Sequence, residues 1–308
     1  MRNSPLGLER LEGRDVPTAY TLTPVVPTLD AALTARLAPV VQRGAGLGNR
    51  PNVFARAGDS ITFASAFLTP LAAPNPGTDA TGDGSLTDSL NYFRSGRVGA
   101  SNPFNRPSSA ALGGLTAAQV LALLPGELAA TKPAFVLVMV GTNDVSLDTP
   151  LDAFRQTIGA IAQTALDAGV VPVLSTIPDM SIAPELAARQ PGYNQVIQDV
   201  AEAAQVPLWN YWRALQRLPN QGISADGVHP SVAPTGGADL GPAGLNYGYN
   251  VRNLTALQTL DKLRRVLLSG QPPDTPNPGA AWAPMTGAIP IAAGDTTGFQ
   301  VQVLDATS

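Results

Sequence analysis

Residues 134–144 read AFVLVMVGTND, and this stretch decides the fold class of the sequence. Its first seven residues are all apolar, which is typical of a strand in a parallel sheet covered on both faces. Gly141 ends the apolar run, and the polar residues Asn143 and Asp144 follow it. We therefore predict a buried strand over 134–140 whose carboxyl end carries polar side chains.

Shorter apolar segments and helical patterns alternate on both sides of this strand. The further strand candidates are 52–57, 170–177 and 206–211. The helical patterns lie over 149–168, 193–204 and 254–268. Pro150 suits the first turn of the first of these helices, and Gly169 suits its end. Because strands alternate with helices, we predict an α/β fold with a central parallel sheet and helices on both of its faces.

Glycine and proline divide the chain into its expected parts. The sequence holds 30 Gly and 29 Pro, and they gather outside the strand and helix patterns, where they indicate loops, insertions and tails. We predict one domain over 51–269 with an insertion at about 69–112, which we expect at the mouth of the site. An N-terminal extension over 1–50, including a glycine-rich linker at 44–49, precedes it. A Pro-rich C-terminal tail over 270–308 follows it.

The composition argues against several classes of protein. The net charge is -4 and no basic run occurs, so nucleic acid is not an expected partner, because phosphate binding needs clustered Lys and Arg. Cysteine is absent, which excludes disulfides and a cysteine nucleophile. No apolar run reaches the roughly 18 residues of a spanning helix, and the N-terminus lacks an ordinary signal peptide pattern. The oligomeric state stays open at this stage.

Polar motifs follow the predicted core segments, and one of them holds His229, the single histidine of the chain. Ser60 follows the first strand and begins a predicted helix, and Asn143 follows the long apolar strand. Asp226 precedes His229 by three residues, a spacing that lets its carboxylate accept a hydrogen bond from one imidazole nitrogen. The other nitrogen is then free to take a proton from a hydroxyl, as in serine hydrolases.

Each of these motifs also has a structural explanation when it is taken alone. Ser60 could cap a helix, and Asn143 could hold a turn. In parallel sheets, however, chemistry collects at the carboxyl ends of the strands. At the carboxyl edge of the predicted sheet, the three motifs together supply a nucleophile, an amide donor, and a base with its orienting carboxylate.

These motifs resemble the blocks of the SGNH hydrolase superfamily, also called GDSL esterases and lipases. Residues 58–61, GDSI, match its GDSL block with Ile in place of Leu. Residues 141–144, GTND, match the G-x-N-D block, and residues 226–230, DGVHP, match the D-x-x-H-P block. For the glycine block the best candidate is Gly114. The alternatives are Gly113, Gly96 and Gly99. The resemblance covers roughly residues 50–268.

The resemblance implies a three-layer α/β/α sandwich and a serine esterase that needs no cofactor. It assigns Ser60 as nucleophile, His229 as base and Asp226 as the residue that orients the imidazole. The Ser60 N–H, the Gly114 N–H and the Asn143 side chain are the implied oxyanion hole, while Asp59 and Asp144 are expected to act structurally. The expected substrate is a small-molecule or carbohydrate-borne ester. A silent scaffold that binds without catalysis, and an acyltransferase with the same residues, are the alternatives.

Two further segments suggest accessory functions. Residues 77–93 resemble a calcium loop with Asp79, Asp83 and Asp88 as candidate ligands, but Leu90 stands where a bidentate carboxylate is needed. A polar turn before a helix near Thr87 is the alternative. Residues 8–18, LERLEGRDVPT, resemble a short tag on many predicted exported bacterial proteins. That likeness favours an exported or cell-envelope-associated protein.

Overall fold

Four parallel strands form the central sheet of the computed structural model, which describes residues 19–73 and 84–275. Their order is β1-β2-β3-β4, and their bounds are Arg50–Gly58, Pro133–Met139, Val171–Ser175 and Leu208–Trp209. Phe54 of β1 lies opposite Phe135 of β2, and Val138 of β2 lies opposite Leu174 of β3. The predicted parallel α/β sheet is therefore confirmed, although β4 is shorter than the expected strand over 206–211.

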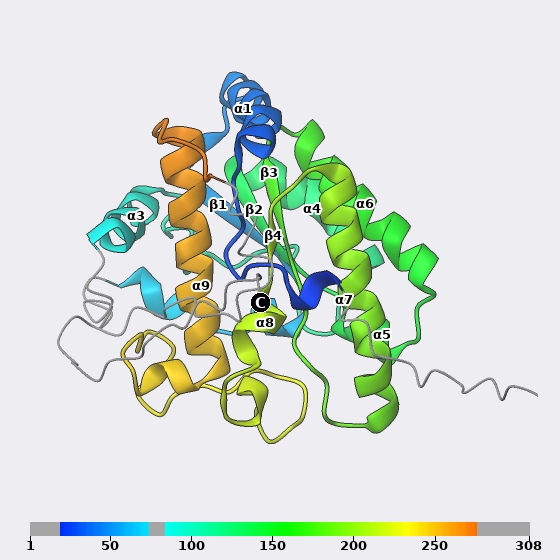
Figure 1. The fold of residues 1–308 in the computed structure, drawn as a ribbon. Helices are drawn as coiled ribbons and strands as arrows, with labels where there is room; N and C mark the ends of the chain where they lie inside the picture. Colours follow the sequence, from blue (N-terminus) through cyan, green and yellow to red (C-terminus); the bar gives the residue numbers. More distant parts are fainter. Residues whose placement is uncertain (1–18, 74–83, 276–308) are drawn as a thin grey trace, which may run out of the picture.

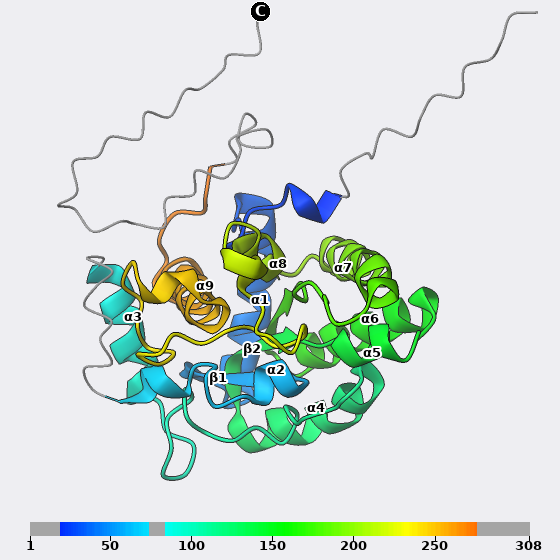
Figure 2. The same cartoon turned by 90° about the horizontal axis from the view of Figure 1, so that it is seen from below.

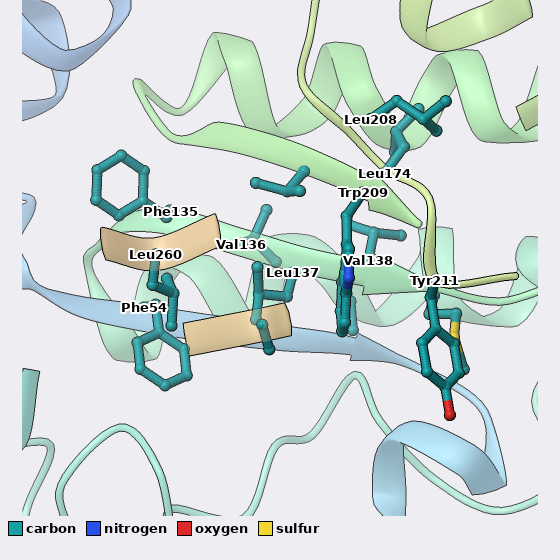
Figure 3. Close-up of a cluster of buried hydrophobic side chains, with 14 of the residues drawn as sticks. Phe54, Phe135, Val136, Leu137, Val138, Leu174, Leu208, Trp209, Tyr211 and Leu260 are labelled. Atoms are coloured by element: carbon teal, nitrogen blue, oxygen red, sulfur yellow. The ribbon is translucent and has the colours of Figure 1, made fainter. Parts of the chain in front are cut away.

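The apolar run that defined the sequence prediction lies at the centre of the core. Every residue of β2 is buried, because neighbouring strands flank it and helices cover both faces. Figure 3 shows this cluster, in which the labelled side chains come from all four strands of the sheet and from α8 and α9. The labelled residues are Phe54, Phe135, Val136, Leu137, Val138, Leu174, Leu208, Trp209, Tyr211 and Leu260.

Helices form a layer on each side of the sheet (Figures 1 and 2). On one side α4, α6 and α7 pack next to one another, with bounds Ala117–Thr131, Leu151–Asp167 and Pro184–Ala204. On the other side lie α1, α3, α8 and α9, with bounds Ala31–Gly46, Gly84–Ser95, Tyr211–Leu215 and Gly248–Leu263. A π-helical turn, Arg264–Leu268, continues α9. These layers make the three-layer α/β/α sandwich that the resemblance implied.

Short helices stand at the carboxyl ends of the first two strands. Helix α2, Ser60–Phe63, follows β1, and α5, Thr142–Ser146, follows β2. The remaining short segments are 3-10 turns at Ala19–Thr21, Thr69–Ala72, Pro219–Gly222 and Gly244–Asn246. Figure 2 looks onto this edge of the sheet and shows α2 and α5 on it.

The N-terminal segment differs from the sequence prediction. Residues 31–46, expected to be part of an N-terminal extension of loops and linker, form α1, and Asp30 caps it by accepting a hydrogen bond from the Leu33 N–H. Gly44, expected in a linker, lies in the last turn of α1 so close to Gly169 that a Cβ would come within 2.1 Å of the Gly169 carbonyl oxygen. Leu37 and Val40 are buried. The helix was missed because Pro39 and its terminal glycines resemble loop composition.

The expected insertion over 69–112 has parts with different surroundings. Within its described residues, α3 packs against β1 and α9, whereas the last residue of the insertion, Leu112, donates to the Gly58 carbonyl at the end of β1. Phe93 and Phe104 contact Phe54 edge to face, and Gly96 contacts the Asn52 carbonyl near the start of β1. The apolar face of α3 therefore completes the core near the amino end of the sheet. Within residues 19–73 and 84–275, no helix is long and apolar enough to cross a membrane.

Candidate active site

Ser60, His229 and Asp226 form one continuous chain of hydrogen bonds. The distance from Ser60 Oγ to His229 Nε2 is 2.9 Å, and the distance from His229 Nδ1 to Asp226 Oδ2 is 2.7 Å. Ser60 is separated from His229 by 169 positions, so the fold brings the two residues together. The arrangement gives the hydroxyl a proton acceptor and gives that acceptor an orienting carboxylate.

The turn between β1 and α2 positions Ser60. Gly58 ends β1 beside Met139, the last residue of β2, and a Cβ on Gly58 would come within 2.0 Å of the Met139 carbonyl oxygen. Asp59 then caps α2 by accepting a hydrogen bond from the Ile61 N–H at 3.1 Å. Ser60 is therefore the first residue of a helix, where backbone N–H groups lack intrahelical partners.

The loop that carries His229 is held by the carboxylate of Asp226. Asp226 Oδ1 accepts from the backbone N–H groups of Val228 and His229, each at 2.9 Å, and from Ser224 Oγ at 2.8 Å. Partial burial by itself would raise the pKa of the Asp226 carboxyl, but these hydrogen bonds and the one to the imidazole hold that pKa well below its usual range. Asp226 is therefore ionised at neutral pH and able to stabilise an imidazolium.

Gly227 is required at its position by a tight turn. Its φ of +72° belongs to the left-handed region, and a Cβ there would come within 2.6 Å of the Ile182 nitrogen. The Ser181 N–H donates to the Gly227 carbonyl at 2.8 Å. The segment after β3 thus supports the loop that carries Asp226 and His229.

The three predicted oxyanion donors lie on segments that the structure brings together. The Asn143 amide donates to the Leu115 carbonyl at 2.9 Å, which ties the segment after β2 to the residue that follows Gly114. The Leu112 N–H donates to the Gly58 carbonyl at 3.3 Å, which ties the same segment to the turn before Ser60. Gly114 has a φ of +80° and is exposed, and among described residues its N–H has no hydrogen-bond acceptor. The second hydrogen of the Asn143 amide is available for a ligand.

The glycine alternatives have different surroundings. Gly113 is the exposed neighbour of Gly114, whereas Gly96 packs on Asn52 at the beginning of β1. Gly99 lies in a turn closed by Val98 and Ser101. Of the four, Gly113 and Gly114 are therefore on the segment that reaches the end of β1.

Two buried carboxyl groups flank the chain of hydrogen bonds. Burial raises the pKa of Asp59 to about 6, against the opposing effect of the Ile61 N–H and of Arg252. Burial also raises the pKa of Asp144, whose Oδ2 accepts from the Ala117 N–H at 2.9 Å. Asp59 caps α2, and Asp144 connects α5 to the start of α4. Both positions have the structural surroundings that the sequence led us to expect.

Sequence reasoning missed two residues of α9 that hold α2. Arg252, only 1% exposed, donates to the Ile61 carbonyl at 2.5 Å and to Thr62 Oγ1 at 3.0 Å. Its guanidinium lies 3.6 Å from the centre of the Phe67 ring. The Tyr249 hydroxyl donates to the same Ile61 carbonyl at 3.2 Å. The sequence signal that could have indicated this contact is Arg252, a charged residue within an apolar helical pattern. That signal does not show which residue the arginine contacts.

The suggested calcium loop lies largely outside the described residues. Asp79 and Asp83 are not described, and Asp88 is an exposed residue of α3. Within residues 19–73 and 84–275, no group of three or more His, Cys, Asp or Glu side chains could hold a metal ion. The calcium hypothesis is therefore left untested by the structure.

The fold and the site together define an α/β protein with a serine, histidine and aspartate chain at the carboxyl edge of its sheet. The model of the GDSL-like Lipase/Acylhydrolase family matches residues 57–233. This match covers more than half of the 308 residues, and the chain belongs to that family. The resemblance read from the sequence motifs is thereby confirmed, and the protein stands among the GDSL-type hydrolases.

Several solved structures are similar to this chain. The lipase/acylhydrolase from Enterococcus faecalis is 19% identical, with 68% of this chain and 95% of that chain covered and a TM-score of 0.47. The esterase EstA from Pseudoalteromonas sp. is 16% identical, with coverage of 68% and 97% and a TM-score of 0.47. An acetyl xylan esterase from Geobacillus stearothermophilus is 19% identical, with coverage of 67% and 93% and a TM-score of 0.43. Among curated proteins, none matches the sequence.

Proposed function

We propose that this protein hydrolyses carboxylic esters through an acyl-enzyme on Ser60. The observation that carries the proposal is the unbroken hydrogen-bonded chain from Ser60 Oγ through His229 to Asp226. Membership of an acylhydrolase family supports the same reaction class. The exposed His229 loop also leaves the serine open to substrates from solution, because the His229 and Asp226 side chains are 40% and 50% exposed.

In the first half of the proposed reaction, Ser60 Oγ attacks the ester carbonyl carbon while its proton passes to His229 Nε2. The carbonyl oxygen becomes negative and accepts hydrogen bonds from the Ser60 N–H, the Gly114 N–H and the Asn143 amide. Asp226 stabilises the imidazolium through Nδ1–H. The tetrahedral intermediate then breaks its bond to the alkoxide, which takes the proton from Nε2 and leaves as the alcohol.

In the second half, water replaces the alcohol. His229 Nε2 takes a proton from water as the water oxygen attacks the acyl carbon, and the same oxyanion donors stabilise the second intermediate. The bond to Ser60 Oγ then breaks, Oγ recovers its proton from Nε2, and the carboxylic acid leaves. No step requires a metal or an organic cofactor.

Hydrolysis of p-nitrophenyl acetate, butyrate and octanoate tests the proposal. We expect Ser60→Ala and His229→Ala to lose at least about a thousandfold in kcat/KM, because each removes a member of a unit that acts together. Ser65→Ala is the matched control, since Ser65 is an exposed serine five positions from Ser60. Circular dichroism shows whether each variant is folded. Full activity of a folded Ser60→Ala variant would reject the proposed nucleophile.

A fluorophosphonate probe distinguishes the alternatives if the wild-type protein hydrolyses none of the three esters. Labelling at Ser60 would mean a working nucleophile that needs another substrate, whereas no labelling would support a silent scaffold. Product analysis in the presence of added alcohols separates transfer to water from transfer to another acceptor. A transesterified product in excess of free acid would favour the acyltransferase reaction.

We also propose that the protein is exported or associated with the cell envelope. The support is the tag-like segment at residues 8–18, which lies outside the described residues. Fractionation of a bacterial host that expresses the full chain, beside a variant without residues 8–18, tests this localisation. Equal cytoplasmic retention of both proteins would contradict it.

A further inference from the structure

The segments that carry Ser60, His229 and Asp226, and the segments that contact them, also carry exposed apolar side chains. Eight large apolar side chains of the described residues are prominently exposed. Five of them are near a site residue in the chain or are joined to one through backbone contacts, and we call these five the apolar rim. They are Phe63 (58% exposed), Leu112 (40%), Leu147 (69%), Ile182 (58%) and Val232 (40%).

Two members of the apolar rim are on either side of the nucleophile. Phe63 follows Ser60 by three positions in α2, so the two side chains share one face of that helix. The Leu112 N–H donates to the Gly58 carbonyl, two residues before Ser60, and Leu112 precedes Gly114 by two. Phe63 and Leu112 therefore belong to the two segments that carry the proposed nucleophile and the proposed Gly114 donor.

The other three members are on the connections that follow the remaining strands. Leu147 follows α5 as its C-cap residue, and its N–H donates to the Asn143 carbonyl, which places it one helical turn from that residue. The Ile182 backbone contacts Gly227, the neighbour of Asp226. Val232 follows His229 by three positions. The apolar rim thus has members from every segment that contributes to the site.

Acidic side chains outnumber basic ones on the same segments, where His229 is the one basic residue. Residues 59–68, 107–117, 141–150, 176–183 and 224–247 contain six Asp and neither Lys nor Arg. Arg189 pairs with Asp148 of these segments at 3.4 Å, and Arg252, which donates to the Ile61 carbonyl, is buried with 1% of its surface exposed. Asp226 is ionised beside the imidazole. A phosphate or carboxylate on the substrate would therefore meet carboxylates and apolar groups, which disfavour an anion.

We propose that the apolar rim binds the hydrocarbon part of an uncharged ester whose carbonyl is attacked by Ser60. This inference rests on the proposed function and names its substrate class. The exposed side chains lose apolar surface to water when an acyl chain lies across them, and the gain grows with each methylene covered. Because these segments hold neither Lys nor Arg, we expect anionic acyl groups to be turned over more slowly than uncharged ones. Leu147 and Ile182 are the members of the apolar rim that lie on neither the nucleophile turn, the Gly114 segment nor the loop of His229.

The substrate series for the test is p-nitrophenyl acetate, butyrate and octanoate with p-nitrophenyl hemisuccinate as the anionic counterpart of butyrate. All are used below the concentration at which octanoate forms micelles. We expect kcat/KM to rise at least about tenfold from acetate to octanoate, because several methylenes become partly buried. We expect butyrate to exceed hemisuccinate by about tenfold or more, because the carboxylate is desolvated without a cation.

A pair of double variants links this preference to the apolar rim. Leu147→Gln with Ile182→Gln removes two rim side chains that lie outside α2, and we expect it to lower the octanoate-to-acetate ratio by about fivefold or more. Leu22→Gln with Leu47→Gln is the matched control, because both side chains are exposed and outside the rim. The control should keep the wild-type ratio. An unchanged ratio in the rim variant overturns the proposal.

The outcomes separate failure of this inference from failure of the proposed function. A wild-type protein that hydrolyses acetate with a flat chain-length profile, or that hydrolyses hemisuccinate as fast as butyrate, overturns the apolar rim alone. A protein that hydrolyses no ester and takes no fluorophosphonate on Ser60 overturns the proposed function, and the inference falls with it. A steep profile that is reduced in the rim variant and kept in the control supports both.

Discussion

Ser60 depends for its position on side chains that come from far along the chain. It begins a helix of four residues, which is too short to be stable without outside contacts. Arg252 and Tyr249 of α9 both donate to the Ile61 carbonyl, and Thr62 Oγ1 donates to the Met139 carbonyl at 3.3 Å. At the scale of single residues, hydrogen bonds from α9 and to the end of β2 therefore fix the position of Ser60, the proposed nucleophile.

Arg252→Met should lower kcat more than it changes KM. The substitution keeps an apolar stem but removes both donors to α2, and displacement of a reacting group by about 1 Å costs on the order of a hundredfold in rate. We expect a tenfold to hundredfold loss of kcat by this reasoning, with partial recovery in Arg252→Lys. Arg94→Met, which removes a half-buried arginine that donates to the Leu71 carbonyl, is the control. A folded Arg252→Met variant with wild-type kcat would exclude a positioning role.

Asp59→Asn should become more stable relative to the wild-type protein as the pH rises from 4.5 to 7.5. The pKa of Asp59 is raised by burial from 3.8 to about 6, so the folded protein binds a proton that the unfolded chain releases. The stability that this proton provides is complete below the unfolded pKa and is lost as the pH rises through the folded pKa. The neutral amide keeps an oxygen acceptor for the Ile61 N–H and has no proton to lose.

The difference in thermal midpoint between wild type and Asp59→Asn, measured across that pH range, checks the sign. A shift of about two pKa units corresponds to roughly 3 kcal/mol at full effect. The other carboxylates titrate in both proteins, so their effect cancels in the difference between the two thermal midpoints. Asp226 is one of them, and its contribution to stability grows as the pH rises, opposite to that of Asp59. A constant difference between pH 4.5 and 7.5 would contradict a raised pKa for Asp59.

At the scale of elements, α1 shows how packing decides whether a glycine is tolerated or required. Glycine inside a helix is less favourable than alanine by about 1 kcal/mol, so helix propensity alone favours replacement. Gly44, however, lies against the backbone of Gly169, whereas a Cβ on Gly46 would meet nothing within 4 Å. In the same helix, packing therefore requires glycine at position 44, whereas alanine would fit at position 46.

Gly44→Ala should destabilise the protein, and Gly46→Ala should not. A Cβ at position 44 would be 2.1 Å from the Gly169 carbonyl oxygen, so α1 must move away from the turn before β3. We expect a loss of about 1–3 kcal/mol for Gly44→Ala, as for other overpacked sites, and a small gain for Gly46→Ala. Chemical denaturation of both variants measures the difference. Equal stability of the two would show that α1 does not pack on Gly169 in this way.

At the scale of the whole molecule, residues near the two ends of the described chain meet. The Leu29 N–H donates to Asp274 Oδ2 at 2.8 Å, and the Asp274 N–H donates to the Leu29 carbonyl at 2.8 Å. Lys262 of α9 pairs with the Asp274 carboxylate at 2.9 Å. The segment after α9 therefore holds the segment before α1. This contact lies well away from the proposed catalytic serine, on elements that carry the scaffold.

Asp274→Ala should lower the thermal midpoint without loss of esterase activity at 25 °C. It removes one hydrogen bond to Leu29 and one ion pair, together worth about 1–2 kcal/mol. For a domain of this size each kcal/mol corresponds to roughly 2–4 °C in the midpoint. Asp167→Ala, which removes an exposed carboxylate of α6, is the control. An unchanged midpoint in Asp274→Ala would show that the contact adds nothing to stability.

Local signals in the sequence determined the fold class and the family of this protein. The apolar run over 134–140 predicted a buried strand because a strand covered on both faces needs apolar residues at every position. The contact between Asp226 and His229 is predictable from the sequence, because a spacing of three positions lets the two side chains meet within one turn of the chain. The family resemblance rested on such short blocks and was confirmed. The catalytic roles of Ser60, His229, Asp226, Gly114 and Asn143 stay a prediction for the kinetic tests above.

Only the tertiary structure decided the features that depend on contacts between distant segments. Three such features are the packing of α1 on Gly169, the position of α3 at the amino end of the sheet, and the hydrogen bonds from Arg252 to α2. Each of them joins residues that are far apart in the sequence. The apolar rim is likewise assembled from loops after different strands, which the sequence shows as scattered single residues. Sequence patterns report the period and polarity of one segment at a time. They carry no information on which surface another segment covers, and that surface decides whether an apolar side chain completes the core or stays exposed beside the site.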